Sequence, residues 1–134
     1  KDVDLIIAGT QSGFLAYNDY NAMMFPTYHQ IFFTALQPDA IIVCINPYDD
    51  VEFVNRIIKA AEGLSGGKVV GIVCFPIDIS EGWKGNFGKK IRISEEKELN
   101  IKSKFSLYRD VQVCMLDKQK DLEKLVSICI DYFQ

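Results

Sequence analysis

The sequence has few of the residue types on which catalysis and metal binding most often depend. Its single histidine, His29, has no serine or cysteine nucleophile near it in sequence, so we interpret it as a surface or interface residue. The four cysteines form no C-x-x-C pair and lie mostly in apolar runs; they are Cys44, Cys74, Cys114 and Cys129. We therefore expect reduced, buried cysteines in a cytoplasmic protein and no metal site, the alternative being a metal held by three strand cysteines.

The sequence also lacks long hydrophobic runs and an excess of positive charge. No apolar run approaches the roughly 18 residues that a membrane-spanning helix needs. A formal net charge of −3 argues against a nucleic-acid partner, because such a partner usually requires a basic face. The chain begins at Lys1 rather than at methionine and has no secretory pattern. We expect one α/β domain over residues 1–134, forming the C-terminal part of a longer protein.

Four nearly continuous apolar runs, rich in β-branched residues, are typical of strands that are covered on both faces in a parallel sheet. They are "VDLIIAG" (3–9), "DAIIVCI" (39–45), "KVVGIVCF" (68–75) and "VQVCML" (111–116). Helical patterns follow each run. The alternation predicts a three-layer α/β fold, Rossmann-like or flavodoxin-like, with an open parallel sheet of about four strands and helices on both faces.

Capping residues predict where the helices begin and end. Asn46 is the expected cap of the second helix, with Pro47 at its first position and Gly63 at its end. Ser94 begins the third helix, and the first is expected from about Pro26 to Gln37. The positions predicted to face inward are Val51, Val54, Ile58 and Ala61 in the second helix, Leu99, Phe105 and Tyr108 in the third, and Leu122, Leu125, Val126, Cys129, Ile130 and Phe133 in the last.

The first helix differs from the others because it is apolar on almost every side. A helix that covers one face of a sheet normally keeps a polar outer side, and "NAMMFPTYHQIFFTAL" has little of one. We predict that it makes a protein–protein contact or self-associates, the alternative being that the long loop over residues 77–93 covers it. The predicted interface residues are Met23, Met24, Phe25, Tyr28, Phe32 and Phe33.

Ligands of open parallel sheets bind beyond the carboxyl ends of the strands, so the loops at that edge are the candidate site. "GTQSG" (9–13) follows the first predicted strand and could hold an anion, although a glycine-permitted exit from the strand explains it equally. "EGWKGNFGKKIR" (81–92) combines glycines, aromatic residues and cations, as a lid over an anionic or planar ligand does, although an ordinary solvated loop whose Trp83 packs on the core explains it equally. The predicted ligand-binding residues are Thr10, Gln11, Ser12, Asn46, Asp78, Trp83, Lys84 and Lys89.

Two carboxylates, Asp78 and Asp117, directly follow predicted strands at the same edge. Carboxylates in that position can hold Mg²⁺, but they also cap the following helix or turn. Capping explains the two carboxylates as well as metal binding does, and we identify no metal site and no cofactor from the residues. The second predicted strand ends in Asn46 rather than in a phosphorylatable aspartate, which argues against a receiver-like domain.

The segments "DLIIAGTQSG", "QPDAIIVCINPYDDVEFV", "FPIDISEGWKGNFGKK" and "SEEKE" together resemble a known family. Over all 134 residues the chain is similar to the C-terminal part of uncharacterised bacterial peptide maturation system proteins, which occur in gene clusters for ribosomally made natural-product peptides. The resemblance implies an accessory role in making or exporting a modified peptide. It brings no catalytic residues with it.

A second resemblance is to P-loop-like proteins, such as the dethiobiotin synthetase and D-glutamate N-acetyltransferase families. It rests on Asp4, Leu36 and the run "QPDA" (37–40). Gly9 stands where that pattern has its metal-binding acid, and no Walker A lysine is present. These departures argue against nucleotide hydrolysis. They are compatible with a degenerate site or with a site that a partner completes. The alternative function is therefore the C-terminal half of a transferase or ligase that binds a phosphorylated substrate.

Overall fold

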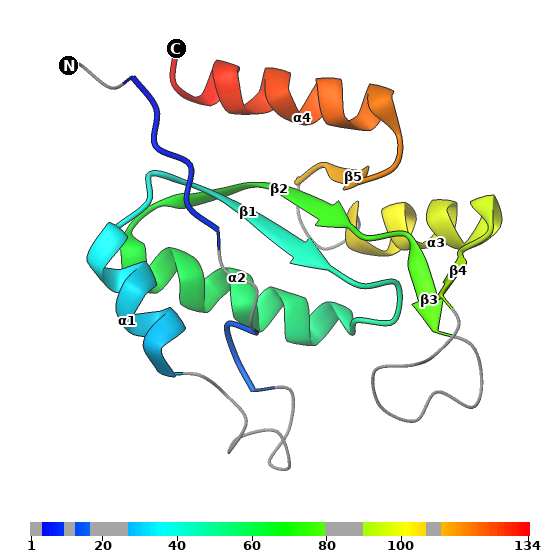
Figure 1. Cartoon of the computed structure of the whole chain (residues 1–134), viewed down its shortest axis with the longest axis horizontal. Helices are drawn as coiled ribbons and strands as arrows, with labels where there is room; N and C mark the ends of the chain where they lie inside the picture. The colour runs from blue at the N-terminus through cyan, green and yellow to red at the C-terminus, as the bar shows by residue number, and fades with distance from the viewer. Residues whose placement is uncertain (1–3, 10–12, 17–26, 80–89, 107–110) are drawn as a thin grey trace.

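The structure, a computed structural model, describes residues 4–9, 13–16, 27–79, 90–106 and 111–134. These residues form an α/β fold with four helices and five strands (Figure 1). In chain order the elements are α1 (Thr27–Leu36), β1 (Ala40–Ile45), α2 (Val51–Ser65), β2 (Lys68–Cys74), β3 (Ile77–Ile79), β4 (Lys90–Arg92), α3 (Glu95–Ser106), β5 (Val113–Met115) and α4 (Gln119–Tyr132).

Three strands form a parallel sheet in the order β1-β2-β5. They confirm three of the four predicted strands, in the runs at 39–45, 68–75 and 111–116. The central strand β2 is buried along most of its length, and its Ile72 pairs with Val113 of β5. Because this strand meets apolar layers on both sides, its sequence is continuously apolar rather than alternating.

Helices lie on both faces of this sheet, with α2 on one side and α4 on the other (Figure 1). The larger core cluster joins alternate residues of β1 (Ile41, Val43 and Ile45) to residues of α2 and α3. A smaller cluster on the opposite face contains Val73 and Cys114, which pack with Leu125 of α4. Alternation along each strand therefore divides the core into two layers.

The strand predicted at 3–9 is not formed in the structure over its described residues. Residues 4–9 form no strand, and the side chains of Leu5, Ile6 and Ile7 are 63%, 79% and 87% exposed. An apolar, β-branched run shows a preference for the extended conformation, but a strand also needs a partner whose peptide groups accept and donate hydrogen bonds. Here the run has the composition of a strand without the pairing.

The predicted long loop at 76–93 contains two short strands that the sequence analysis did not expect. β3 and β4 pair antiparallel, with Ile77 opposite Arg92 and Ile79 opposite Lys90. The pair follows directly on the carboxyl end of β2, where the amide of Ile93 donates to the carbonyl of Pro76 at 3.0 Å. This hairpin brings β4 back to the sheet edge at which β2 ends.

The predicted ends of α2 are wrong by two to four residues. Asp50, not Asn46, is the N-cap, and its carboxylate accepts from the amides of Glu52 and Phe53 at 2.6 and 3.2 Å. The amide of Asn46 instead donates to the carboxylate of Asp49 at 2.8 Å, which closes a turn before the helix. At the other end the helix continues through Gly63 to Ser65, because Gly66 adopts the left-handed conformation at φ 77° that ends it.

The predicted inward positions are confirmed for α2 and only in part for α3 and α4. All four positions predicted for α2 are buried. On α3, Phe105 is buried but Leu99 is 67% exposed, and Tyr108 lies outside the described residues. On α4, only Leu125 is fully buried, Leu122 and Cys129 are half-buried, and the others are exposed; the exposed ones are Val126, Ile130 and Phe133. The outer apolar stripe of α4 therefore lies open.

The cysteines are all free thiols, and two of the four are buried as predicted. Cys74 and Cys114 are buried, Cys129 is half-buried, and Cys44 is exposed on β1. The expectation that all are buried is thus wrong for Cys44, because the described residues leave its side of β1 uncovered. Among the described residues, no group of histidine, cysteine and carboxylate side chains is placed to hold a metal ion. No described helix has the length and apolar character to cross a membrane.

Candidate functional site

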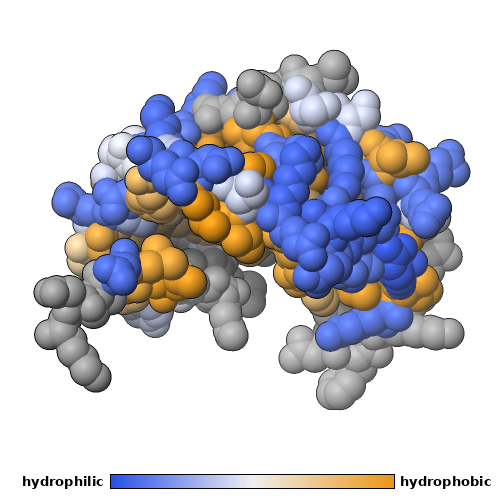
Figure 2. Space-filling model, turned by 90° about the horizontal axis from the view of Figure 1, so that it is seen from above, coloured by the Kyte–Doolittle hydropathy of each residue, from blue (hydrophilic) through white to orange (hydrophobic). Residues whose placement is uncertain are grey.

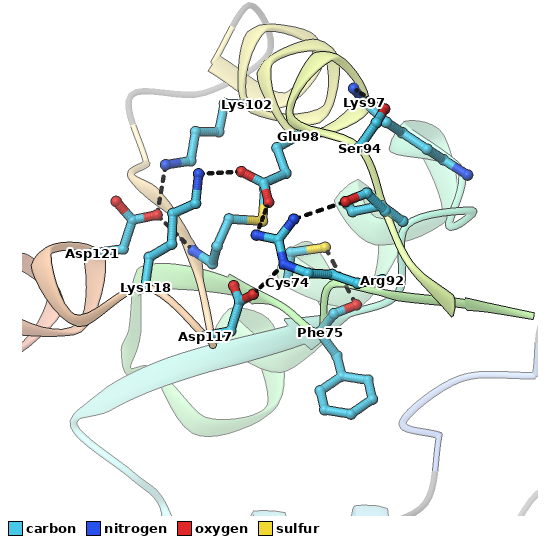
Figure 3. Close-up of polar contacts among 12 residues, drawn as sticks. Cys74, Phe75, Arg92, Ser94, Lys97, Glu98, Lys102, Asp117, Lys118 and Asp121 are labelled. Carbon is cyan, nitrogen blue, oxygen red and sulfur yellow. Dashed lines mark hydrogen bonds and ion pairs between the residues drawn. The ribbon is translucent and has the colours of Figure 1, made fainter. Parts of the chain in front are cut away.

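The carboxyl ends of β2 and β5 meet the β3–β4 pair and α3 at one edge of the sheet. Polar side chains of β4, of α3 and of the segment that leads from β5 into α4 gather there, as Figure 3 shows. Each is brought to the edge by a strand end or by the first turns of α3 and α4. This edge is the place where an open parallel sheet is expected to bind a ligand.

An ion-pair cluster of Arg92, Glu98, Asp117 and Lys118 forms the centre of this edge. The guanidinium of Arg92 donates through Nε to Asp117 at 2.7 Å, through one terminal nitrogen to the carbonyl of Ile93 at 2.8 Å, and through the other to Glu98. Lys118 pairs with the second oxygen of Glu98. Glu98 is 2% exposed, so its two cationic partners supply the compensation that a buried carboxylate needs.

The cluster also affects the protonation of its members. Hydrogen bonding to Asp117, and to Glu98 as well, raises the pKa of Arg92 against a smaller effect of burial. The hydrogen bond to Glu98 raises the pKa of Lys118. Both side chains are therefore cations at neutral pH, and both are already paired with carboxylates. An anionic ligand at this point has to displace one of these carboxylates.

Two further ion pairs tie α3 to the same edge. Lys97 pairs with Asp78 of β3. Lys102 pairs with Asp121 of α4 at 2.5 Å, as Figure 3 shows. The carboxylate of Asp121 also accepts from the amide of Met115 at 2.8 Å. Together these contacts hold α3, the hairpin and the start of α4 in a fixed arrangement.

The pair formed by Lys102 and Asp121 gives a pH-dependent prediction. Burial raises the pKa of Asp121, but the Lys102 ammonium and the Met115 amide outweigh it and lower the pKa below the ordinary value of 3.8. A folded-state pKa below the unfolded value adds stability that is present above that value and is lost as the pH falls through the folded pKa. We expect Asp121→Asn to lower the free energy of unfolding by about 1–2 kcal/mol at pH 7.

Denaturant unfolding between pH 7 and pH 2 tests this expectation. The curves of the variant and the parent chain should converge as the pH falls. Asp131→Asn, on the exposed side of α4, is the control and should leave the profile unchanged. A difference between Asp121→Asn and the parent that stays constant down to pH 2 contradicts the role assigned to this carboxylate.

A shallow hollow of about 200 Å³ lies beside the ion-pair cluster. It is lined by Phe75, Pro76, Ile77, Arg92, Leu116 and Asp117. Phe75 and Leu116 are each 45% exposed, and Figure 3 shows the ring of Phe75 pointing away from the charged groups. The hollow is mainly apolar, with one paired cation and one carboxylate at its side.

The buried thiol of Cys74 and the more exposed phenol of Tyr48, both near this edge, are held in their neutral forms. Burial raises the pKa of Cys74 to about 11, and the nearby carboxylates of Asp49 and Glu98 add to the effect. Burial and then the charges of Asp49 and Asp78 raise the pKa of Tyr48. Cys74 is therefore a neutral thiol in the core rather than a nucleophile.

Two of the predicted ligand-binding residues lie in the described part of the chain. Asn46 is exposed after β1 and takes part in the turn with Asp49. Asp78 lies in β3, where it pairs with Lys97 of α3. The other predicted ligand-binding residues lie outside the described residues; they are Thr10, Gln11, Ser12, Trp83, Lys84 and Lys89.

Glu98 is the site residue that the sequence analysis missed. Ser94 begins α3 as expected, with its hydroxyl accepting from the amide of Lys97 at 3.3 Å. Glu98 then occupies the same face as Ile101 and Phe105, at spacings of three and seven residues. A carboxylate in line with the buried apolar positions of a helix is the signal that could have identified it.

A second candidate surface is the outer side of α1. No residue of this helix is fully buried, and Tyr28, Ile31, Phe32 and Leu36 are 42–73% exposed. A hollow of about 430 Å³ lies along it, where α1 approaches α2. The lining contains no charged side chain and consists of Gln30, Ile31, Thr34, Ala35 and Leu64.

The predicted interface residues divide between the two sides of α1. Tyr28 and Phe32 are exposed, as an interface requires. Phe33 instead packs against the larger core cluster, and its ring meets that of Phe14 edge-on at a centroid distance of 4.9 Å. The assignment of Phe33 to the interface is therefore wrong, because this position faces the sheet. Met23, Met24 and Phe25 lie outside the described residues. His29 is half-buried on the same helix.

Comparisons of the chain with protein-family models, with curated proteins and with solved structures each gave no match.

Proposed function

We propose that this chain is a protein-binding accessory module of Rossmann-like layering, which binds an apolar segment of a partner polypeptide along α1. The single observation that carries the proposal is the uncharged apolar surface of this helix. Four large apolar side chains of α1 are exposed beside a hollow against Leu64. Surfaces of this kind on a soluble domain mark interaction sites.

The composition of the α1 surface determines the chemistry of the partner. From Thr27 to Leu36 the helix contains no aspartate, glutamate, lysine or arginine. The two polar groups of the adjoining hollow are already engaged, since Thr34 donates to the carbonyl of Gln30 at 2.7 Å and Gln30 donates to the carbonyl of Phe14 at 3.4 Å. An uncharged segment with aliphatic or aromatic side chains is the complement of such a surface.

The resemblance to peptide maturation system proteins supplies the class of partner. A ribosomally made peptide in the cytoplasm presents extended segments with apolar side chains, and an accessory module holds such a segment for the enzymes that modify it. The charged edge of the sheet is the other surface on which a partner could bind. Its cations are paired within the chain, so we assign to this edge the role of holding α3 and the hairpin in place.

Selection of random linear peptides displayed on phage tests this function. We expect the selected peptides to be rich in aliphatic and aromatic residues and poor in charge. Ile31→Asp should weaken their binding about 10- to 100-fold, because burial of one isoleucine side chain contributes about 1.5–3 kcal/mol. Leu99→Asp is the matched control, since Leu99 on α3 is 67% exposed and Ile31 is 68% exposed.

Three outcomes contradict the proposal. The first is a selection that yields no enriched peptides. The second is an equal loss of binding in Ile31→Asp and Leu99→Asp. The third is a dimer in sedimentation velocity that Ile31→Asp converts to a monomer, because the α1 surface then belongs to a second copy of the chain.

A further inference from the structure

The outer edge of β1 is a strand edge without a neighbour among the described residues. β1 ends the sheet order β1-β2-β5. On its inner side, the carbonyls of Asp39 and Ile45 accept from the amides of Lys68 and Phe75, each at 3.0 Å. Peptide groups alternate in direction along a strand, so those of Ala40, Ile42 and Cys44 point outward, away from β2. An edge of this kind accepts an added strand.

Exposed apolar side chains lie next to this edge of β1. Ile42 is 43% exposed and Cys44 is also exposed, since the residues that cover the opposite face of β1 do not reach them. Val126 and Ile130 of α4 add to the exposed apolar surface. Figure 2 views the molecule from above Figure 1 and shows hydrophobic residues gathered between two hydrophilic regions.

Residues 4–9 have the properties of the missing neighbour. They match β1 in length, at six residues each, and contain three consecutive aliphatic side chains that are 63–87% exposed. In the view of Figure 1 the segment crosses the direction of β1 instead of running beside it. Burial of aliphatic side chains away from water is favourable, which favours a paired position over the exposed one.

The handedness of strand connections determines on which side of β1 such a strand lies. α1 contacts α2, and Phe33 of α1 packs against the same core cluster as α2, so both helices lie on one face of the sheet. Connections between parallel strands are right-handed in nearly all proteins. With α2 connecting β1 to β2 on this face, a strand that precedes α1 lies on the side of β1 opposite β2. That side is the unpaired edge.

The chain close to residues 4–9 is anchored near this edge. Phe14 packs against Phe33 and against the core cluster that contains the inner residues of β1. From Gly9 to Phe14 the chain can span at most about 17 Å. This short tether favours the edge of the same chain over that of a second copy.

We propose that Asp4–Gly9 add to the outer edge of β1 as a fourth parallel strand of the same chain. Pairing of the two six-residue segments without an offset places Asp4 beside Ala40 and Gly9 beside Ile45. Leu5 and Ile7 then face α1 and α2, while Ile6 and Ala8 share the face of Ile42 and Cys44. This inference concerns a surface distinct from the α1 surface and is independent of the proposed function.

Disulfide trapping in the whole chain tests the paired strand. Ala8→Cys and Ile7→Cys are made separately in a Cys129→Ala background and oxidised at low protein concentration. Neighbouring strands lie about 4.8 Å apart, which suits a disulfide. Ala8→Cys should form an intramolecular bond to Cys44, whereas Ile7→Cys should not, because its side chain points to the helices.

Three results overturn the inference. They are a cross-link of Cys44 between two copies, equal cross-linking of the two variants, and cross-linking of neither. Hydrogen exchange of the unmodified chain supplies a measurement that needs no substitution. The amides of Ile42 and Cys44 should exchange as slowly as that of Val43, which faces β2; exchange at the rate of an open strand edge also overturns the inference.

Discussion

Replacing Gly67 by alanine is expected to lower the free energy of unfolding by about 3 kcal/mol or more, at the upper end of the cost of overpacking. A Cβ atom at this position would lie 2.0 Å from the carbonyl oxygen of Pro38 and 2.9 Å from that of Asp39. Both are backbone atoms, so relief requires that β1 and β2 separate where they begin. The hydrogen bond from the amide of Lys68 to the carbonyl of Asp39 lies at this point.

Gly63→Ala is the matched control for Gly67→Ala. Gly63 lies within α2, and a Cβ atom added there meets no atom within 4 Å. Alanine in a helix is more favourable than glycine by about 0.5–1 kcal/mol, so this variant should be more stable than the parent chain. Thermal or denaturant unfolding of the two variants measures both changes. A Gly67→Ala chain as stable as the parent contradicts the close approach of β1 and β2.

Replacing Ile72 by alanine is expected to lower the free energy of unfolding by about 2–5 kcal/mol. Ile72 lies in the central strand, pairs with Val43 on one side and Val113 on the other, and is 2% exposed. Truncation removes contacts to the larger core cluster and leaves a cavity that the paired strands cannot close. Urea unfolding monitored by circular dichroism measures the loss.

The control for Ile72→Ala is Ile130→Ala on α4, where the side chain is 52% exposed. This variant should lose less than about 1 kcal/mol, since little apolar surface returns to water. Equal losses at the two positions contradict the assignment of β2 to the centre of the sheet.

The fold could be predicted from the sequence wherever the apolar residues of a strand or helix themselves show which positions are buried. β1, β2 and β5 are continuously apolar, and α2 buries its predicted stripe of four residues. Residues 4–9 have the same composition and are not paired. The composition of a segment indicates whether it prefers the extended conformation, whereas strand pairing depends on contacts between residues that are distant in sequence.

Competition between neighbouring capping residues explains why the predicted ends of α2 differ from the observed ones. Asn46, Asp49 and Asp50 are all capping residues within five positions, and the sequence does not rank them. In the structure Asp49 binds the amide of Asn46, which leaves Asp50 to cap the helix. At the other end, Gly66 and not Gly63 has the positive φ that ends a helix.

The polar contacts at the carboxyl edge of the sheet could be predicted only in part. The carboxyl edge of the sheet was expected from the parallel topology, and Asp78 and Asp117 lie there. Their partners were not predictable, because Lys97 and Arg92 reach them from α3 and β4 across gaps of 19 and 25 residues. Glu98 was missed because a carboxylate on a helix is usually solvated. The exposed side of α1 followed directly from its uncharged sequence.

We propose that a partner binds α1 and not the charged edge of the sheet. Chemical-shift mapping of the whole chain with a phage-selected peptide distinguishes these two surfaces. We expect the largest shifts at Tyr28, Ile31, Phe32 and Leu64. Largest shifts at Phe75, Arg92 and Asp117 instead would contradict this proposal, because they would assign binding to the hollow at the carboxyl ends of the strands.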